Sequence, residues 1–355
     1  MKIFELEVSE DTVQGRFERW RQARRLEALP VGGSAGDDWF QAGCHLFHRI
    51  FGTDRNELRN LLERAVTENL DFAPLLLQVR NGQPGDVRPF EVFWETLVGC
   101  TLGTSPPFFF PFGRLPSSIV LARSPNLGSL AECNVAVAEE KKWRVAIVSV
   151  PSHSKFLVTT QAQNLSSLLA SLSSRTRNFE IVSRVEYTGD NGREVYEDLC
   201  SKRVNLVDII ADAADDHHPE RISVGNREEP WKPLLDQIGD VATLQMVLLT
   251  CCVSDHFRPG AVQPPVQLND KGVAAVVAWN PRPWDYTLPP FYRAFYTAMA
   301  KGSHIARAVS YGRSAILNAI NLNEGGEWLN AFAPRLYIHP WARPEQLRFP
   351  PPAIE

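Results

Sequence analysis

The sequence lacks the features of a membrane protein, a secreted protein or a nucleic-acid-binding protein. No stretch approaches the roughly 18 consecutive apolar residues that a membrane-spanning helix needs. The first residues lack the basic and then apolar segments of a secretory signal peptide. The formal net charge of -4 gives no overall positive field that would attract nucleic acid or an anionic membrane. We therefore expect a cytoplasmic protein with no nucleic-acid or membrane partner.

The cysteines lack the spacing of a metal site or a disulfide framework. All 6 are scattered along the chain except for one adjacent pair, Cys251 and Cys252. No C-x-x-C motif is present, so neither a zinc site nor a set of disulfides fits the pattern. Phosphate-binding loops of the G-x-x-x-x-G-K-[ST] and G-x-G-x-x-G kinds are missing as well. We expect a reducing compartment and no cofactor or bound metal.

The composition is that of a globular protein with room for two regions. The chain has 355 residues, of which 44% are hydrophobic and 22% charged. Residues 1–84 are predicted to form a lead-in that packs on a main domain at 85–355. The lead-in is predicted to contain a half-buried strand at its start, an amphipathic helix beginning at the N-cap Asp54, and a buried strand at 73–80.

Between the lead-in and the regular part of the chain lie two aromatic segments, at 90–100 and 105–116, of which the second is rich in proline. Frequent proline in this part of the chain argues against a long helix and predicts an ordered loop or edge strands.

Strand-like and helix-like patterns alternate from residue 143 onward. The strand-like segments 143–151 and 179–187 flank a helix-like segment at 163–176, which is typical of a βαβ unit. Further strands are predicted at 205–213, 244–252 and 272–280, further helices around 193–202 and at 288–302, and a helix or loop up to about Thr243. This alternation predicts an α/β fold, with a mostly parallel sheet and helices on both faces.

The adjacent cysteines end one of the predicted parallel strands. Catalytic groups collect at the carboxyl ends of strands in such sheets. Neighbouring residues of a strand face opposite sides, so at most one of the two thiols can point into a given site. Without other information, two buried, apolar cysteines are the simpler interpretation.

Several motifs follow one another in a characteristic order. Leu249, Cys252 and Ser254 fill an L-x-x-C-x-S pattern at a strand end, and Gly272 to Val277 match a G-A-x-x-V-V strand. Next come an aromatic helix with Phe291 to Tyr296, then Gly302, and then an Ala- and Arg-rich helix over 305–317. Upstream, a P-W-E-L-L signature is matched by Trp94, Glu95 and Leu97, with Phe93 in place of the proline. From about residue 85 to 340 the chain thus resembles the CHAT family, whose fold is caspase-like.

The resemblance implies a Cys/His dyad with Cys252 as the candidate nucleophile. In active members the thiolate attacks a peptide carbonyl and the histidine acts as base and then as acid. That histidine should end the preceding central strand and be followed by a glycine, whose surroundings supply the oxyanion hole. Here Asp212 stands at the expected histidine position and Ala213 at the glycine position. A carboxylate raises the pKa of a nearby thiol, which opposes formation of the nucleophile.

Two hypotheses follow for the function. The first is a non-catalytic CHAT protein that binds a protein partner, as scaffold, sensor or regulator in a prokaryotic stress or defence system. The second is an active cysteine endopeptidase with a polypeptide substrate, in which Cys252 uses a relocated histidine, His217 or His218. Five or six residues of loop are long enough to bring either imidazole back toward the site.

The segment around these histidines admits two further interpretations. Its acidic residues and imidazoles are suitable ligands for a divalent metal, but a solvated loop is the simpler interpretation. His256, four residues after Cys252, is an additional histidine close to the strand end.

Overall fold

The computed structural model describes the strands of the N-terminal part and most of the chain after residue 141. The described residues are 3–6, 76–79, 98–101, 108–111, 142–152, 158–212, 221–252, 264–279, 285–319, 333–339 and 341–350.

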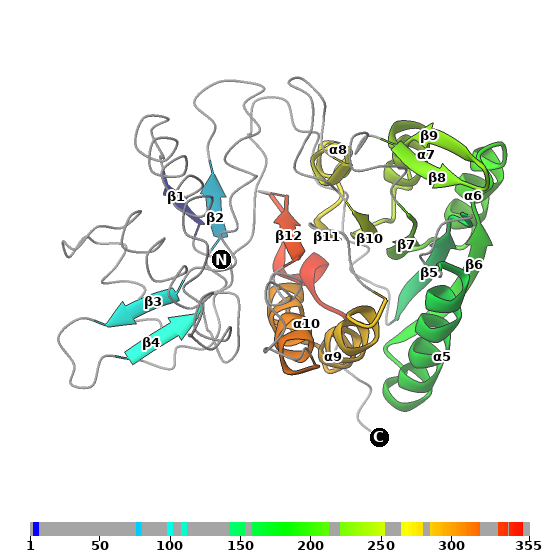
Figure 1. The fold of residues 1–355 in the computed structure, drawn as a ribbon. Helices are drawn as coiled ribbons and strands as arrows, with labels where there is room; N and C mark the ends of the chain where they lie inside the picture. The colour runs from blue at the N-terminus through cyan, green and yellow to red at the C-terminus, as the bar shows by residue number, and fades with distance from the viewer. Residues whose placement is uncertain are drawn as a thin grey trace, which may run out of the picture.

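A six-stranded sheet forms the centre of the described part (Figure 1). Its strands are β5 (Trp143–Ser149), β6 (Phe179–Glu186), β7 (Leu206–Ile210), β10 (Met246–Cys252), β11 (Ala275–Trp279) and β12 (Pro334–Ile338). They lie in the order β12-β11-β10-β7-β5-β6, and every neighbouring pair is parallel except β11 and β12. The predicted mostly parallel α/β sheet is confirmed.

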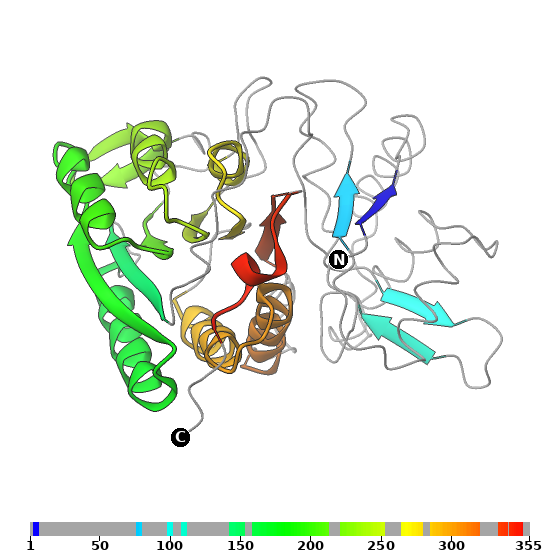
Figure 2. The same cartoon turned by 180° about the vertical axis from the view of Figure 1, so that it is seen from behind.

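Helices cover both faces of the sheet (Figures 1 and 2). One layer consists of α5 (Val158–Thr176), α9 (Leu288–Ala300) and α10 (Ile305–Ala319), and the other of α6 (Gly192–Ser201), α7 (Trp231–Gly239) and α8 (Pro264–Asp270). Among the described helices, none is long and apolar enough to cross a membrane. The prediction of helices on both faces is also confirmed.

The alternation of side chains along the strands produces two separate hydrophobic cores. In β7, Leu206 and Ile210 pack into the core under α5, α9 and α10. Val207 and Ile209 pack into the core under α6, α7 and α8. All five residues of β7 are buried, as expected of a strand covered on both faces. The continuous apolar run in the sequence therefore reflects a central position in the sheet.

Short strands lie outside the main sheet. β1 (Ile3–Leu6) pairs in parallel with β2 (Leu76–Val79), β3 (Val98–Thr101) pairs antiparallel with β4 (Phe108–Pro111), and β8 (Arg221–Val224) forms a hairpin with β9 (Arg227–Pro230). The strands predicted at the start of the chain and at 73–80 are thereby confirmed, as are edge strands in the two aromatic segments. The helix from Asp54 lies outside the described residues, and the boundary at residue 84 stays a prediction.

The structure adds three features to the predicted elements. The stretch predicted as helix or loop contains the β8–β9 hairpin followed by α7. Its connection is Gly225-Asn226, a dipeptide typical of two-residue hairpin turns, and Gly225 has the positive φ of 58° that such turns require. The short helix α8 and the antiparallel strand β12 were not predicted.

Candidate functional site

The ends of β7 and β10 bring Asp212 and Cys252 to the same edge of the sheet. These two strands are direct neighbours, and Ile210 pairs with Thr250 in their register. The backbone N–H of Ala211 continues the pairing by donating to the carbonyl of Thr250 at 3.2 Å. Asp212 and Cys252 each follow this pair by two residues, at what we call the carboxyl edge.

The two adjacent cysteines differ in their surroundings. Cys251 is 1% exposed and belongs to the core under α6, α7 and α8, so the prediction that it faces the core is confirmed. Of Cys252 the structure describes the backbone, which pairs with Trp279 of β11. The register of β10 and β11 shifts between Leu249 and Cys252. Such irregularities are common beside active sites, where they redirect the end of a strand.

Asp212 is a buried residue rather than part of a solvated loop. Its exposed fraction is 2%. Its backbone is held in place because the N–H of Ser223, in β8, donates to its carbonyl at 2.9 Å. The end of β7 is thus connected to β8 at Asp212.

The other predicted site residues lie outside the described residues. These are Ala213, His217, His218, the neighbouring acids Asp215 and Asp216, and also Ser254 and His256. Within the described part of the chain, no group of three or more His, Cys, Asp or Glu side chains is arranged to hold a metal ion.

A buried polar cluster that the sequence analysis missed lies directly beneath the carboxyl edge. Asp208, in β7, is fully buried; its Oδ2 accepts a hydrogen bond from Tyr296 at 2.9 Å. Its Oδ1 lies 3.3 Å from the Thr250 hydroxyl and 3.4 Å from that of Tyr292. The Thr250 and Tyr292 hydroxyls are themselves 2.6 Å apart. The cluster therefore joins β7, β10 and α9 two to four residues before the strand ends that carry Asp212 and Cys252.

Burial determines the chemistry of this cluster. It raises the pKa of Asp208 to about 7, although hydrogen bonds from Tyr296, Thr250 and Tyr292 act in the opposite direction. Burial and the nearby Asp208 also raise the pKa of Tyr292 and of Tyr296 well above the usual value, so both phenols remain donors. Asp208 thus holds or releases a proton near neutral pH. The sequence did contain a signal for this cluster. It is an Asp inside an apolar run, Asp208, together with two Tyr residues four positions apart on one predicted helix.

The β8–β9 hairpin is hydrogen-bonded to the same carboxyl edge, near the ends of β5 and β6. The N–H of Gly225 donates to the carbonyl of Pro151 at 2.7 Å, just after β5, and Gly225 also forms a parallel bridge with Ser152. Because Ser223 contacts Asp212 as well, the hairpin links the exits of β5 and β7.

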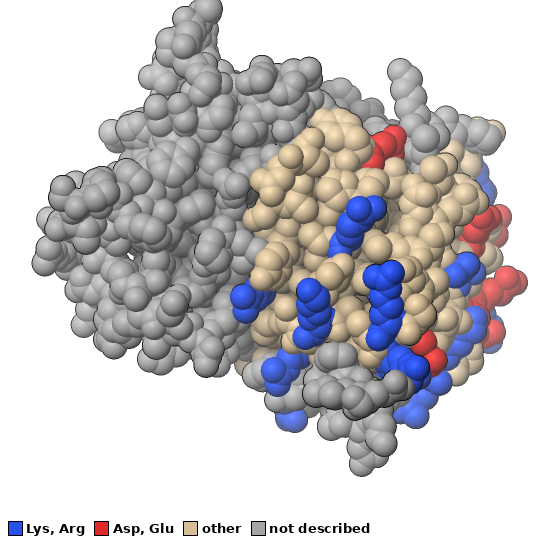
Figure 3. All heavy atoms as spheres, turned by 90° about the horizontal axis from the view of Figure 1, so that it is seen from below, with Lys and Arg blue, Asp and Glu red and all other residues tan. Residues whose placement is uncertain are grey.

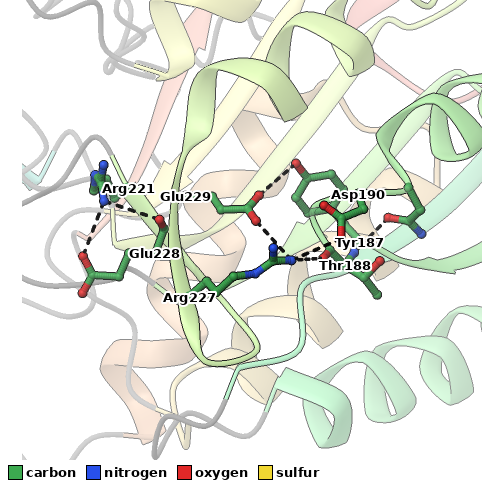
Figure 4. Close-up of polar contacts among 8 residues, drawn as sticks. Tyr187, Thr188, Asp190, Arg221, Arg227, Glu228 and Glu229 are labelled. Atoms are coloured by element: carbon green, nitrogen blue, oxygen red, sulfur yellow. Dashed lines mark hydrogen bonds and ion pairs between the residues drawn. The ribbon is translucent and has the colours of Figure 1, made fainter.

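Polar contacts also connect the hairpin to the loop after β6 (Figure 4). Arg227 donates to the carbonyl of Thr188 at 3.3 Å and lies 3.5 Å from Asp190 and 3.6 Å from Glu229. The Tyr187 hydroxyl donates to the other oxygen of Glu229 at 3.5 Å. These long, largely exposed contacts contribute little stability individually. They orient the hairpin beside the carboxyl edge.

Comparison with known proteins gives matches among solved structures only. No family model matches the chain, and no curated protein does. The chain is similar to the complex of Porphyromonas gingivalis RgpB pro- and mature domains, with a TM-score of 0.48, 10% identity, and coverage of 98% of this chain and 80% of that chain. It is similar to the Saccharomyces cerevisiae separase–securin complex, with a TM-score of 0.44, 12% identity, and coverage of 94% of this chain and 23% of that chain. This protein thus spans less than a quarter of that separase–securin chain.

Proposed function

We propose that this protein is a CHAT-like pseudo-peptidase, which binds a protein partner and does not cleave peptide bonds. The observation that carries the proposal is the buried Asp212 at the carboxyl edge, on the strand next to the one that ends at Cys252. The mostly parallel sheet with helices on both faces agrees with the caspase-like fold that the resemblance implies.

Catalysis by Cys252 would require its thiolate form. A nucleophilic cysteine needs a neighbour that stabilises its negative charge, such as a protonated histidine. An acidic side chain at the position of that histidine has the opposite effect on the thiol. Ala213 also stands where glycine would allow the unusual backbone angles of an oxyanion-hole turn. Both substitutions disfavour catalysis.

The alternative is a working cysteine endopeptidase with a relocated base, His217 or His218. Cys252 at the end of a central parallel strand supports it, since catalytic groups gather there. Under either hypothesis the partner is a polypeptide, as a bound protein in the first case and as a substrate in the second. The resemblance also suggests a role in a prokaryotic stress or defence system, and the cysteine pattern suggests the cytoplasm.

A cleavage assay distinguishes the two hypotheses. The full chain would be incubated with a complex mixture of peptides from a digested proteome, and new amino termini would be detected by mass spectrometry. We expect the wild type and Cys252→Ala to give the same peptides. Cleavage that disappears in Cys252→Ala and in the double variant His217→Ala/His218→Ala would favour the endopeptidase instead. The variant Asp212→His/Ala213→Gly is included to test whether the Cys/His dyad can be restored with Cys252.

A further inference from the structure

The end of the sheet opposite the candidate site carries a concentration of positive charge. The parallel strands point upward in Figure 1, so Figure 3, seen from below, looks onto their amino ends; Lys and Arg side chains gather there, with fewer Asp and Glu. We define the basic surface as the exposed side chains of Arg175, Arg177, Lys301, Arg343 and Arg348. The adjoining helices α5, α9 and α10 contain no Asp or Glu.

One buried residue connects the backbone turns that carry three of these cations. Asn178 is 1% exposed, and its side-chain amide donates to the carbonyls of Ala300 at 2.9 Å and Pro350 at 2.6 Å. The backbone carbonyl of Asn178 accepts a hydrogen bond from the backbone N–H of Trp143 at 3.0 Å. Arg177 precedes Asn178, Lys301 follows Ala300, and Arg348 lies two residues before Pro350. Three turns of the chain are therefore tied together, which reduces the ordering cost of binding at this surface.

The segment that carries Arg348 is anchored on both sides. Phe349 packs against the rings of Trp143 and Phe179, with centroids 5.2 Å away in each case. Arg348 itself forms an antiparallel bridge with His304. Burial lowers the pKa of His304 to about 4, and the positive charge of Arg348 contributes in the same direction.

Arg177 occupies a backbone position that does not suit arginine. It follows the last residue of α5 with a φ of 57°, in the left-handed region that glycine adopts at helix ends without steric cost. Favourable interaction with the carboxyl end of the helix accounts for a cation such as Arg175 in the last turn. It does not account for a side chain at a position where glycine would fold more easily. Arg177 thus places an exposed positive charge at the end of α5 in spite of this backbone cost.

We propose that the basic surface, together with Trp341, binds a short acidic segment of a protein partner. Trp341 is 51% exposed, and it follows β12 in the same segment as Arg343 and Arg348. Exposed Trp combined with several Arg is the composition of hot spots in protein interfaces. Arginine also pairs with carboxylates through two parallel hydrogen bonds.

The charge of the whole chain favours a short acidic segment over a long polyanion. The formal net charge is -4 even with these cations included, so the remainder of the chain is acidic and repels an extended nucleic acid. Because the basic surface lies at the opposite end of the strands from Cys252, the proposal holds whether or not that cysteine is catalytic.

The test uses the full chain and a fluorescein-labelled peptide of Asp and Glu residues with one central Phe. Binding would be followed by fluorescence anisotropy at low and at physiological salt. We expect the wild type to bind, and Arg177→Gln/Lys301→Gln/Arg348→Gln to bind about tenfold more weakly or worse, since each exposed ion pair contributes modestly. Trp341→Ala, which removes no charge, should weaken binding about threefold or more.

The matched control is Arg184→Gln/Arg193→Gln/Lys232→Gln, which removes the same charge from exposed positions elsewhere. It should weaken binding no more than about twofold, because those positions are distant from the basic surface. Arg177→Gly separates binding from folding, since it should lower affinity while keeping or raising the Tm.

Three results would overturn the proposal. The first is an equal loss of peptide binding in the control and in the basic-surface variant. The second is no binding of the peptide by the wild type. The third is tighter binding of a labelled single-stranded DNA of equal length than of the peptide.

Discussion

At the scale of single residues, Asp208 shows how strongly position in the fold changes the chemistry of a side chain. The carboxyl group is fully buried in β7 and is satisfied by hydroxyl groups from β10 and α9. With its pKa raised to about 7, it is partly protonated at neutral pH. It lies on the strand that leads to Asp212, four residues before that residue.

Asp208→Asn is predicted to remove a pH dependence of folding. The folded-state pKa of about 7 exceeds the ordinary aspartate value of 3.8, so the folded protein binds more protons between these pH values. The free energy of unfolding should therefore fall as the pH rises from about 4 to about 7, by up to about 4 kcal/mol in total. An Asn amide keeps one acceptor and offers donors, so the variant should gain stability relative to the wild type across this range.

The measurement is urea unfolding of both proteins at a series of pH values. Asp236→Asn is the control, because the pKa of Asp236 is lowered: hydrogen bonds from Lys232 and Gln267 outweigh the effect of burial. Asp236→Asn should therefore be less stable than the wild type above the pKa of Asp236 in the unfolded chain. This difference in the free energy of unfolding should vanish as the pH falls. Equal pH profiles for Asp208→Asn and the wild type would contradict the assignment.

At the scale of elements, the helix ends explain how the chain turns back into the sheet. α6 ends in a Schellman motif, in which the N–H of Val204 donates to the carbonyl of Leu199 at 3.1 Å. Arg203 takes the left-handed position of that motif with a φ of 49°. The same conformation occurs at Arg177 after α5, so two helices end on a non-glycine residue at the position that favours glycine.

Arg203→Gly is predicted to stabilise the fold by about 0.5–1 kcal/mol, because the left-handed strain of the arginine exceeds the entropy lost by glycine. The measurement is thermal or urea unfolding against the wild type. Glu197→Gly, at an exposed position in the interior of α6, is the control and should destabilise by a similar amount. A loss of stability in Arg203→Gly would mean that contacts of its side chain outweigh the backbone strain.

The elements also show what the sequence could predict. β5, β7, β10 and β11 were predicted because both of their faces are buried, which leaves nearly continuous apolar runs. The β8–β9 hairpin was missed because its second strand, Arg227–Pro230, is largely exposed and charged, so it has no apolar pattern. α8 is only 7 residues long and begins with two prolines, too short for a helical period to appear.

The candidate site was predictable to a different extent. The alternation of side chains along a strand correctly predicted that Cys251 belongs to the core. The burial of Asp212 was not predictable, because a residue just beyond a strand is buried or exposed according to what packs on it. Here that is the β8–β9 hairpin, which the sequence analysis did not recognise.

At the scale of the whole molecule, the sheet separates the two regions for which we propose functions. The candidate site lies at the carboxyl edge, whereas the basic surface lies at the amino ends of the parallel strands. The antiparallel direction of β12 creates this arrangement, since it delivers residues 341–350 to the amino ends. Trp341, Arg343 and Arg348 thereby join the turns after α5 and α9. A partner bound at the basic surface leaves the carboxyl edge accessible.

The proposed pseudo-peptidase carries a cysteine without an activating base. The most direct measurement is alkylation of Cys251 and Cys252 in the folded full chain as a function of pH, resolved by site with mass spectrometry. The account predicts that Cys251, which is 1% exposed, stays unreactive. It also predicts that Cys252 titrates near or above the ordinary thiol value of about 8.5. Selective reaction of Cys252 well below neutral pH would contradict the account and establish an activated thiolate.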